Sequence, residues 1–137
     1  MKQESTKGND AGSLLKTIAT SSISGSGTRL VFGEGMTAMK EALDNGGKYI
    51  LVNPEVVSKL KESNIDPFLI YEAALRLEVE SKNPQIDFIG GNVDQLVQQW
   101  GGKPQEQAPV HVRQIIWLKE NAGKYGYQQS GNSWKLK

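Results

Sequence analysis

Helix-breaking residue pairs divide the chain into short segments, and their spacing constrains the fold more than any other feature of the sequence. Asn53-Pro54 and Asp66-Pro67 each place a good N-cap before a proline. The first helical position tolerates proline because its missing N–H would be unpaired there anyway. Asn45-Gly46-Gly47 and Gly101-Gly102 end helices, because glycine accepts the left-handed conformation that helix ends favour. These breaks predict short helices alternating with short strands.

Apolar periodicity between the breaks predicts the individual elements. Residues 28–32 and 48–52 are β-rich, and Met36, Met39 and Leu43 between them have the spacing of one helical face. A strand, a helix and a strand within about 25 residues permit a parallel β-α-β unit, although an antiparallel arrangement stays open. Further helices are expected after residue 53, over 67–82, from 92 or 93 to 100 and over 109–122; a hairpin is expected over 125–136, and 86–89 is ambiguous between strand and loop.

The predicted fold class is α+β: a single helix-dominated domain over residues 28–137, with a small sheet and a C-terminal β-hairpin. A chain of 137 residues is long enough for one hydrophobic core and short for two. Residues 1–27 are rich in Ser, Thr, Gly and Lys and have few apolar groups to offset their ordering entropy. We therefore expect a flexible N-terminal arm there, with Leu14, Leu15 and Ile18 spaced for a short helical contact.

The composition excludes several kinds of site. The chain has no cysteine and one histidine, which rules out disulfides, thiolate metal sites, a cysteine nucleophile and any site with two imidazoles. No apolar run approaches the roughly 18 residues that cross a bilayer, and residues 1–7 lack the apolar stretch of a secretory signal. We therefore expect no metal, no cofactor and no membrane insertion. The expected location is cytoplasmic, or virion-associated if a phage encodes the protein.

Two further features carry no predicted chemistry. His111 lies in the first turn of the last predicted helix, and a lone imidazole acts as a base only with a partner, which the sequence does not reveal. We therefore expect a surface histidine. Gly33-Glu34-Gly35 does not form a phosphate loop, because no lysine follows it in the Gly-Lys-Ser/Thr arrangement.

Residues 78–100 show a first resemblance, to cell-wall enzymes. Glu80-Ser81 precedes Asn83-Pro84, and Gly90-Gly91 and a Leu-Val-Gln-Gln-Trp run follow. This stretch resembles the Glu-Ser-x-x-Asn-Pro and Gly-Leu-x-Gln-Trp segments of lysozyme-like transglycosylases and phage tail lysozymes, with one residue missing before Asn83 and Gln95 in place of the glycine. The resemblance implies that Glu80 is a general acid acting on peptidoglycan.

The pattern around Glu80 favours a different role. Glu72, Arg76 and Glu80 lie four residues apart, which makes a charge ladder on the solvent side of the long helix. A general acid instead needs an apolar pocket that raises its pKa. The helical spacing therefore favours a structural glutamate.

Residues 117–135 show a second resemblance. Trp117-Leu118, Asn121-Ala122 and Tyr125-Gly126-Tyr127 are similar to the Trp-Leu-x-x-Asn-Ala-x-x-Tyr-Gly-Phe segment of zinc D,D-carboxypeptidases of the vancomycin-resistance type. That family has a zinc-binding Trp-His pair near the chain end, where this chain has Trp134-Lys135. The resemblance implies a cell-wall-related module that does not work as a zinc enzyme.

The charge distribution supports a nucleic-acid-binding alternative. Residues 29–106 have 8 Lys or Arg and 12 Asp or Glu, whereas residues 111–137 have 5 and 1. A basic helix followed by a basic hairpin resembles the end of a winged-helix module. Cations would neutralise phosphates and aromatic rings would stack on bases, the candidates being Arg113, Lys119, Lys124, Lys135 and Lys137, with Tyr125, Tyr127 and Trp134.

The sequence thus leaves three hypotheses for a bacterial or phage protein. The first is a peptidoglycan hydrolase-like or peptidoglycan-binding module, and the second is a nucleic-acid-binding module. The third is a phage structural protein or a protein that binds a host protein, in which residues 1–27 order on the partner. The residues favour a binding or structural role over catalysis.

Overall fold

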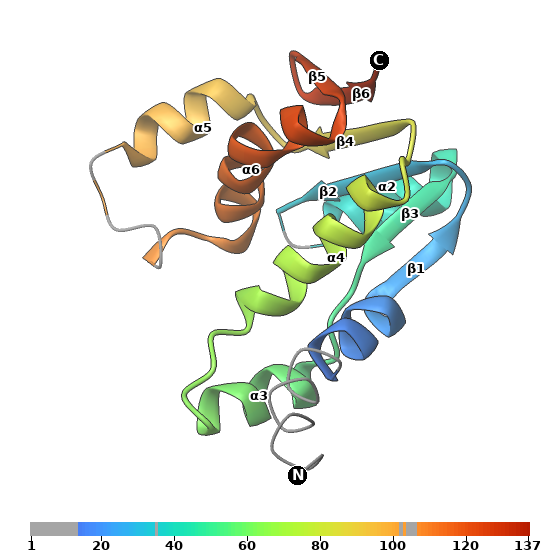
Figure 1. The fold of residues 1–137 in the computed structure, drawn as a ribbon. Helices are drawn as coiled ribbons and strands as arrows, with labels where there is room; N and C mark the ends of the chain where they lie inside the picture. Colours follow the sequence, from blue (N-terminus) through green and yellow to red (C-terminus); the bar gives the residue numbers. More distant parts are fainter. Residues whose placement is uncertain (1–13, 35, 102, 104–106) are drawn as a thin grey trace, which may run out of the picture.

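The structure is a computed structural model that describes residues 14–34, 36–101, 103 and 107–137. Within these residues, six strands form one sheet in the order β1-β3-β2-β4-β6-β5 (Figure 1). The strands are β1 (Ile23–Ser26), β2 (Arg29–Gly33), β3 (Gly47–Ile50), β4 (Gln85–Ile89), β5 (Tyr127–Ser130) and β6 (Ser133–Leu136). The helices are residues 14–22, α2 (Thr37–Asn45), α3 (Pro54–Glu62), α4 (Phe68–Glu80), α5 (Val93–Trp100), α6 (Val110–Asn121) and the 3₁₀ helix η2 (Ala122–Tyr125). The predicted α+β class is confirmed.

The centre of the sheet is parallel. Strand β2 pairs in parallel with β3 on one side and with β4 on the other. This pairing decides between the two arrangements that the sequence left open, and it assigns residues 86–89 to a strand. The predicted C-terminal hairpin is also confirmed, since β5 and β6 pair antiparallel and β6 extends the sheet beside β4.

The predicted helix starts form because polar side chains satisfy free backbone N–H groups. The Asn53 side chain accepts a hydrogen bond from Glu55 N at 2.8 Å, ahead of Pro54 at the first position of α3. The Asn92 side chain caps α5 through Gln95 N at 3.0 Å. Asp66 likewise accepts from Phe68 N at 3.0 Å.

Helices cover both faces of the central strands. Alternate residues of a strand point to opposite faces, so Val31 packs against α2 on one face. In Figure 1, α4 and α6 lie in front of the sheet and α2 lies behind it. The main core on the α4 and α6 face comprises Leu30, Phe32, Leu75, Val79, Ile86, Phe88, Val93, Ile115, Trp117, Leu118, Ala122, Tyr127 and Trp134. No helix among the described residues is both long and apolar enough to span a membrane.

The folded part begins earlier than expected. Residues 14–26, which we assigned to a flexible arm, form a helix and strand β1. Ala19 is fully buried in a second apolar cluster with residues of α3 and α4, and Leu15 packs against that cluster. Strand β1 pairs antiparallel with β3, and Gly25 allows this close approach because a Cβ there would collide with the Gly47 carbonyl oxygen. Residues 1–13 of the predicted arm lie outside the described residues.

A network of polar side chains links β2, β4 and β6 on the face of the sheet that α2 covers. Asp87 of β4 is buried, and its carboxylate accepts hydrogen bonds from Arg29 Nε at 2.5 Å and Ser133 Oγ at 2.6 Å. Gln85 donates to the same carboxylate. Burial raises the pKa of Asp87, but the hydrogen bonds from Ser133, Arg29 and Gln85 outweigh it, so the pKa lies below its ordinary value.

We expect the Asp87→Asn variant to lose about 1–3 kcal/mol of stability at pH 7, because charged hydrogen bonds of this kind contribute that much. An acid whose pKa is depressed by folding stabilises the protein above its unfolded pKa and loses that contribution as the pH falls through the folded pKa. The difference between the wild type and the variant should therefore shrink below about pH 4. Urea denaturation at pH 7 and at pH 3 measures both values.

Asp44→Asn is the matched control, since Asp44 is exposed on α2 and makes no described ion pair or side-chain hydrogen bond. It should leave stability nearly unchanged at both pH values. Equal stability of Asp87→Asn and the wild type at pH 7 would contradict the proposed role of the network.

Candidate functional site

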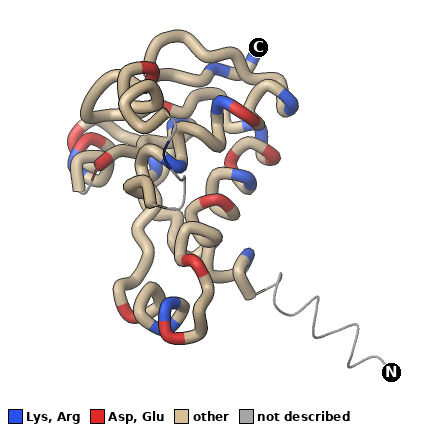
Figure 2. The backbone as a smooth tube through the Cα atoms, turned by 90° about the vertical axis from the view of Figure 1, so that its left-hand side faces the viewer, with Lys and Arg blue, Asp and Glu red and all other residues tan. Residues whose placement is uncertain are grey.

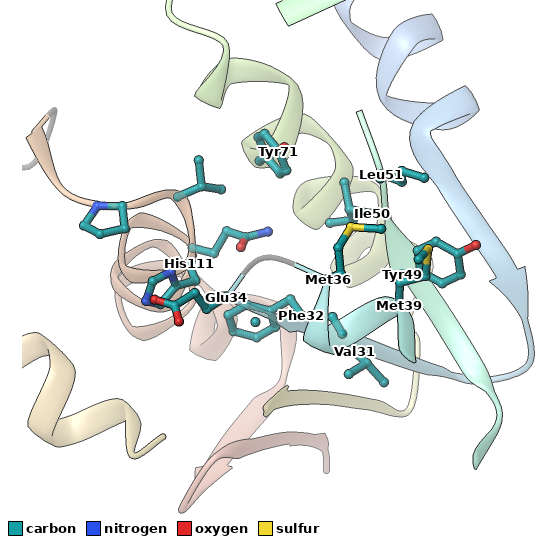
Figure 3. Close-up of a pocket in the computed structure, with 15 residues that line it drawn as sticks. Val31, Phe32, Glu34, Met36, Met39, Tyr49, Ile50, Leu51, Tyr71 and His111 are labelled. Atoms are coloured by element: carbon teal, nitrogen blue, oxygen red, sulfur yellow. The ribbon is translucent and has the colours of Figure 1, made fainter. Parts of the chain in front are cut away.

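A cavity of about 430 Å³ opens at the carboxyl ends of β2 and β3 (Figure 3). The chain leaves β2 towards β3 through α2, while β4 lies on the other side of β2, so the connections after β2 and β4 diverge at this end of the sheet. In open sheets with parallel strands, ligands bind in the crevice at such a point. The cavity lies at this end of the sheet, beside β2 and on its β3 side.

Most of the cavity wall is apolar and aromatic. Figure 3 shows Phe32 of β2, Met36 beside α2, Ile50 of β3 and Tyr71 of α4 around the same space. Methionine adapts its shape to irregular surfaces, and Met36 is 54% exposed at the edge of the cavity. This wall suits the apolar body of a small molecule.

Two buried polar side chains of α6 complete the wall. His111 is 9% exposed and Gln114 is 3% exposed, and they lie three positions apart on the helix. Among the described residues, no side-chain hydrogen bond is made by either of them. Every fully buried side-chain nitrogen and oxygen in the described part of the chain does have a partner. The polar atoms of His111 and Gln114 therefore keep access to the cavity.

The His111 ring is held between an aromatic ring and a carboxylate. It stacks on Phe88, with ring centroids 6.1 Å apart and an interplanar angle of 17°. Figure 3 shows the Glu34 carboxylate next to the imidazole. Burial lowers the pKa of His111, and the charge of Glu34 opposes this in part, so that the pKa stays below its ordinary value. The imidazole is therefore neutral at pH 7, with one donor and one acceptor nitrogen.

The expectation of a surface histidine was wrong, because the fold buries His111 and gives it Glu34 as a neighbour. A signal for its burial was present in the sequence. His111, Gln114, Ile115 and Leu118 have the i, i+3, i+4, i+7 spacing of one helical face. Glu34 had no such signal, because it lies in the loop after β2 and only the tertiary structure brings it to α6.

Glu80 lies away from this cavity. Its side chain is exposed at the end of α4, beside an open groove of about 290 Å³ that Leu15, Lys16, Glu72 and Arg76 also line. Arg76 and Glu72 form an ion pair at 3.8 Å, as the predicted ladder requires. The neighbouring carboxylate of Glu78 is the buried one in this helix, and it accepts a hydrogen bond from Asn83 Nδ2 at 2.6 Å. The catalytic role of Glu80 stays a prediction.

The candidate nucleic-acid-binding residues fall into three groups. Arg113 and Lys119 are engaged in ion pairs, with Asp66 at 2.8 Å and Asp94 at 2.6 Å. The rings of Tyr127 and Trp134 are buried in the main core, and burial followed by the charge of Glu78 raises the pKa of Tyr127 to about 12. Lys124, Lys135 and Lys137 are exposed and Tyr125 is half-buried, in the C-terminal part of the chain, where Figure 2 shows lysines near the chain end.

No protein-family model matches this chain, and no curated protein sequence or solved structure is significantly similar to it. The two local resemblances to cell-wall enzymes therefore stay predictions. Across the described residues, no group of three His, Cys, Asp or Glu side chains is arranged to hold a metal ion.

We expect the single histidine to titrate below its ordinary pKa of 6.5, because burial disfavours the charged imidazole. The unfolded chain then takes up the proton first, so the free energy of unfolding decreases as the pH falls from about 6.5. Glu34→Gln removes the charge that favours imidazolium, and it should lower the pKa further. A proton–carbon NMR titration reads the imidazole without ambiguity, since the chain has one histidine.

Glu120→Gln serves as the control for this titration. Glu120 is exposed on the same helix and makes no described ion pair, so its loss should leave the pKa of His111 unchanged. A pKa above 6.5 in the wild-type protein, or an unchanged pKa in Glu34→Gln, would contradict the geometry of this pair.

Proposed function

We propose that this protein is a small-ligand-binding module whose cavity takes an amphipathic molecule. The apolar body of the ligand packs against Phe32, Met36 and Tyr71, and its polar end group bonds to His111 and Gln114. The observation that carries the proposal is the presence of two buried polar side chains that face the cavity and have no described hydrogen-bond partner.

The surroundings of Gln114 support a ligand. The Gln114 side chain is 3% exposed, and its amide makes no described hydrogen bond to the protein. Its polar atoms stay accessible from the cavity, since no fully buried side-chain nitrogen or oxygen in the described part of the chain lacks a partner. A polar group of a bound ligand could therefore bond to both the donor and the acceptor of this amide.

The composition of the wall supports binding over catalysis. The described residues that line the cavity have no Ser, Thr, Cys or Lys side chain to act as a nucleophile. His111 offers a single neutral imidazole, and Glu34 is an exposed carboxylate. The polar groups of this wall can hold and orient a ligand.

The earlier hypotheses stay open as predictions with less support. Glu80 lies on an exposed helix end without the apolar enclosure that a general acid needs. For nucleic acid, the exposed Lys124, Lys135 and Lys137 support contacts with phosphates. The burial of Tyr127 and Trp134 leaves base stacking without those two rings.

We expect Gln114→Met to separate binding from folding. Because the Gln114 amide bonds to no described residue and methionine keeps the length of the side chain, the variant should leave the ligand-free protein equally stable or up to about 1 kcal/mol more stable. Benzamide is a suitable probe, since it has a flat apolar body and a group that complements Gln114. Titration of the wild type should shift the backbone amide resonances around the cavity, and the variant should lose these shifts.

Gln98→Met is the matched control, because Gln98 is exposed on α5 and lies outside the cavity wall. It should bind benzamide as the wild type does. If Gln114→Met destabilises the ligand-free protein by several kcal/mol, Gln114 has a structural role and the proposal fails.

A further inference from the structure

We infer that the cavity selects ligands by charge, that Glu34 is the residue that determines this specificity, and that the ligand presents a planar, N–H-rich and preferably cationic end group such as an amidinium or guanidinium. This inference rests on the proposed function and specifies the class of ligand that the site takes. Anionic end groups are the class that the site rejects.

Glu34 supplies the only formal charge on the described part of the cavity wall. No Lys or Arg side chain is among the described residues that line it. Sites for carboxylates and phosphates commonly use Arg or Lys side chains for charge-assisted hydrogen bonds. Here the one charged group is an acceptor, and an anion placed beside it would be repelled.

The polar groups beside Glu34 suit a donor-rich partner. The neutral imidazole of His111 offers one acceptor nitrogen, and the Gln114 amide offers an acceptor oxygen next to its two donor hydrogens. Together with the Glu34 carboxylate, these groups provide acceptors from α6 and from the loop after β2. A planar group with several N–H donors can satisfy more than one of them at the same time.

The aromatic wall favours the same class of ligand. Phe32, Tyr49 and Tyr71 line the cavity, and the faces of such rings attract cations within about 6 Å. The chain uses this interaction elsewhere in its fold, where the Arg113 guanidinium lies 4.2 Å from the centroid of the Phe68 ring. An amidinium or guanidinium in the cavity would therefore lie near both a carboxylate and aromatic rings.

The N-terminal ends of α2 and α6 also border the cavity, and a helix N-terminus favours anions. Its partial charge is spread over several N–H groups, some of which are already engaged. Thr37 N and Thr37 Oγ1 donate to the Glu34 carbonyl oxygen, while Val112 N and Arg113 N donate to the Pro109 carbonyl oxygen. These hydrogen bonds leave fewer free N–H groups at the two helix ends for an anionic ligand.

Three probes of nearly identical shape test this inference. Benzamidine, benzamide and benzoate share one ring and differ in an end group that is cationic, neutral or anionic. In NMR titrations of the full-length protein at pH 7.5, we expect benzamidine to bind most tightly and benzoate at least tenfold more weakly. A tenfold difference corresponds to about 1.4 kcal/mol, which we assign to the interaction of the end group with the Glu34 charge. Because Glu34→Gln removes this charge, it should bring the three affinities to within about threefold of one another. Glu120→Gln should keep the wild-type order.

The outcomes separate this inference from the proposed function. If benzamide binds the wild type but benzoate binds equally well or better, the cavity is a ligand site and the charge selection is wrong. If none of the three probes shifts the resonances of cavity residues, the proposed function fails together with the inference. A capped arginine amide, as a fourth probe, distinguishes the source of the cation. Tighter binding than benzamidine assigns the end group to a polypeptide side chain, and weaker binding assigns it to a free aromatic molecule.

Discussion

The pairing of β2 with a parallel neighbour on each edge is the constraint on which the rest of the structure depends. Strand β2 hydrogen-bonds to β3 and to β4, and its Leu30 and Val31 each have 0% solvent exposure. A strand that is buried on both faces needs a helix on each side. The positions of α2, α4 and α6 follow from this need. The position of the cavity follows as well, since it opens where β2 ends and is lined by residues of these three helices.

Local signals account for the parts of the fold that were predictable from sequence. Asn53-Pro54 and Asn92 start helices through side-chain caps, which depend on residues within three positions of one another. Strand β1 was missed because its contribution is a backbone ladder with β3, and residues 23–26 carry almost no apolar pattern. The site was missed for a related reason. The proximity of Glu34 and His111 depends on how α6 returns to the end of β2, which no local pattern contains.

The glycines around the site illustrate how one motif can have two physical explanations. Gly33-Glu34-Gly35 failed as a phosphate loop for want of a lysine. The structure gives Gly33 a different reason, because a Cβ there would collide with the carbonyl oxygen of Ile89 on the neighbouring strand. Gly33 thus allows β2 and β4 to remain paired up to their last residues. The loop that follows is therefore held at the cavity by the sheet, and Glu34 reaches the imidazole of α6 from there.

The Asp87 network and the pair of His111 and Gln114 at the cavity differ in how their buried polar side chains are hydrogen-bonded. Asp87 is surrounded by Arg29, Ser133 and Gln85, so its buried charge is fully compensated within the protein and stabilises the pairing of three strands. His111 and Gln114 are buried to a similar degree, make no described side-chain hydrogen bond, and have their polar atoms open to the cavity. A fold that can satisfy a buried carboxylate with three donors has the means to satisfy an amide as well. The difference between the two regions is the basis of the ligand site that we propose, and Asp87 belongs to the scaffold that supports the sheet beside it.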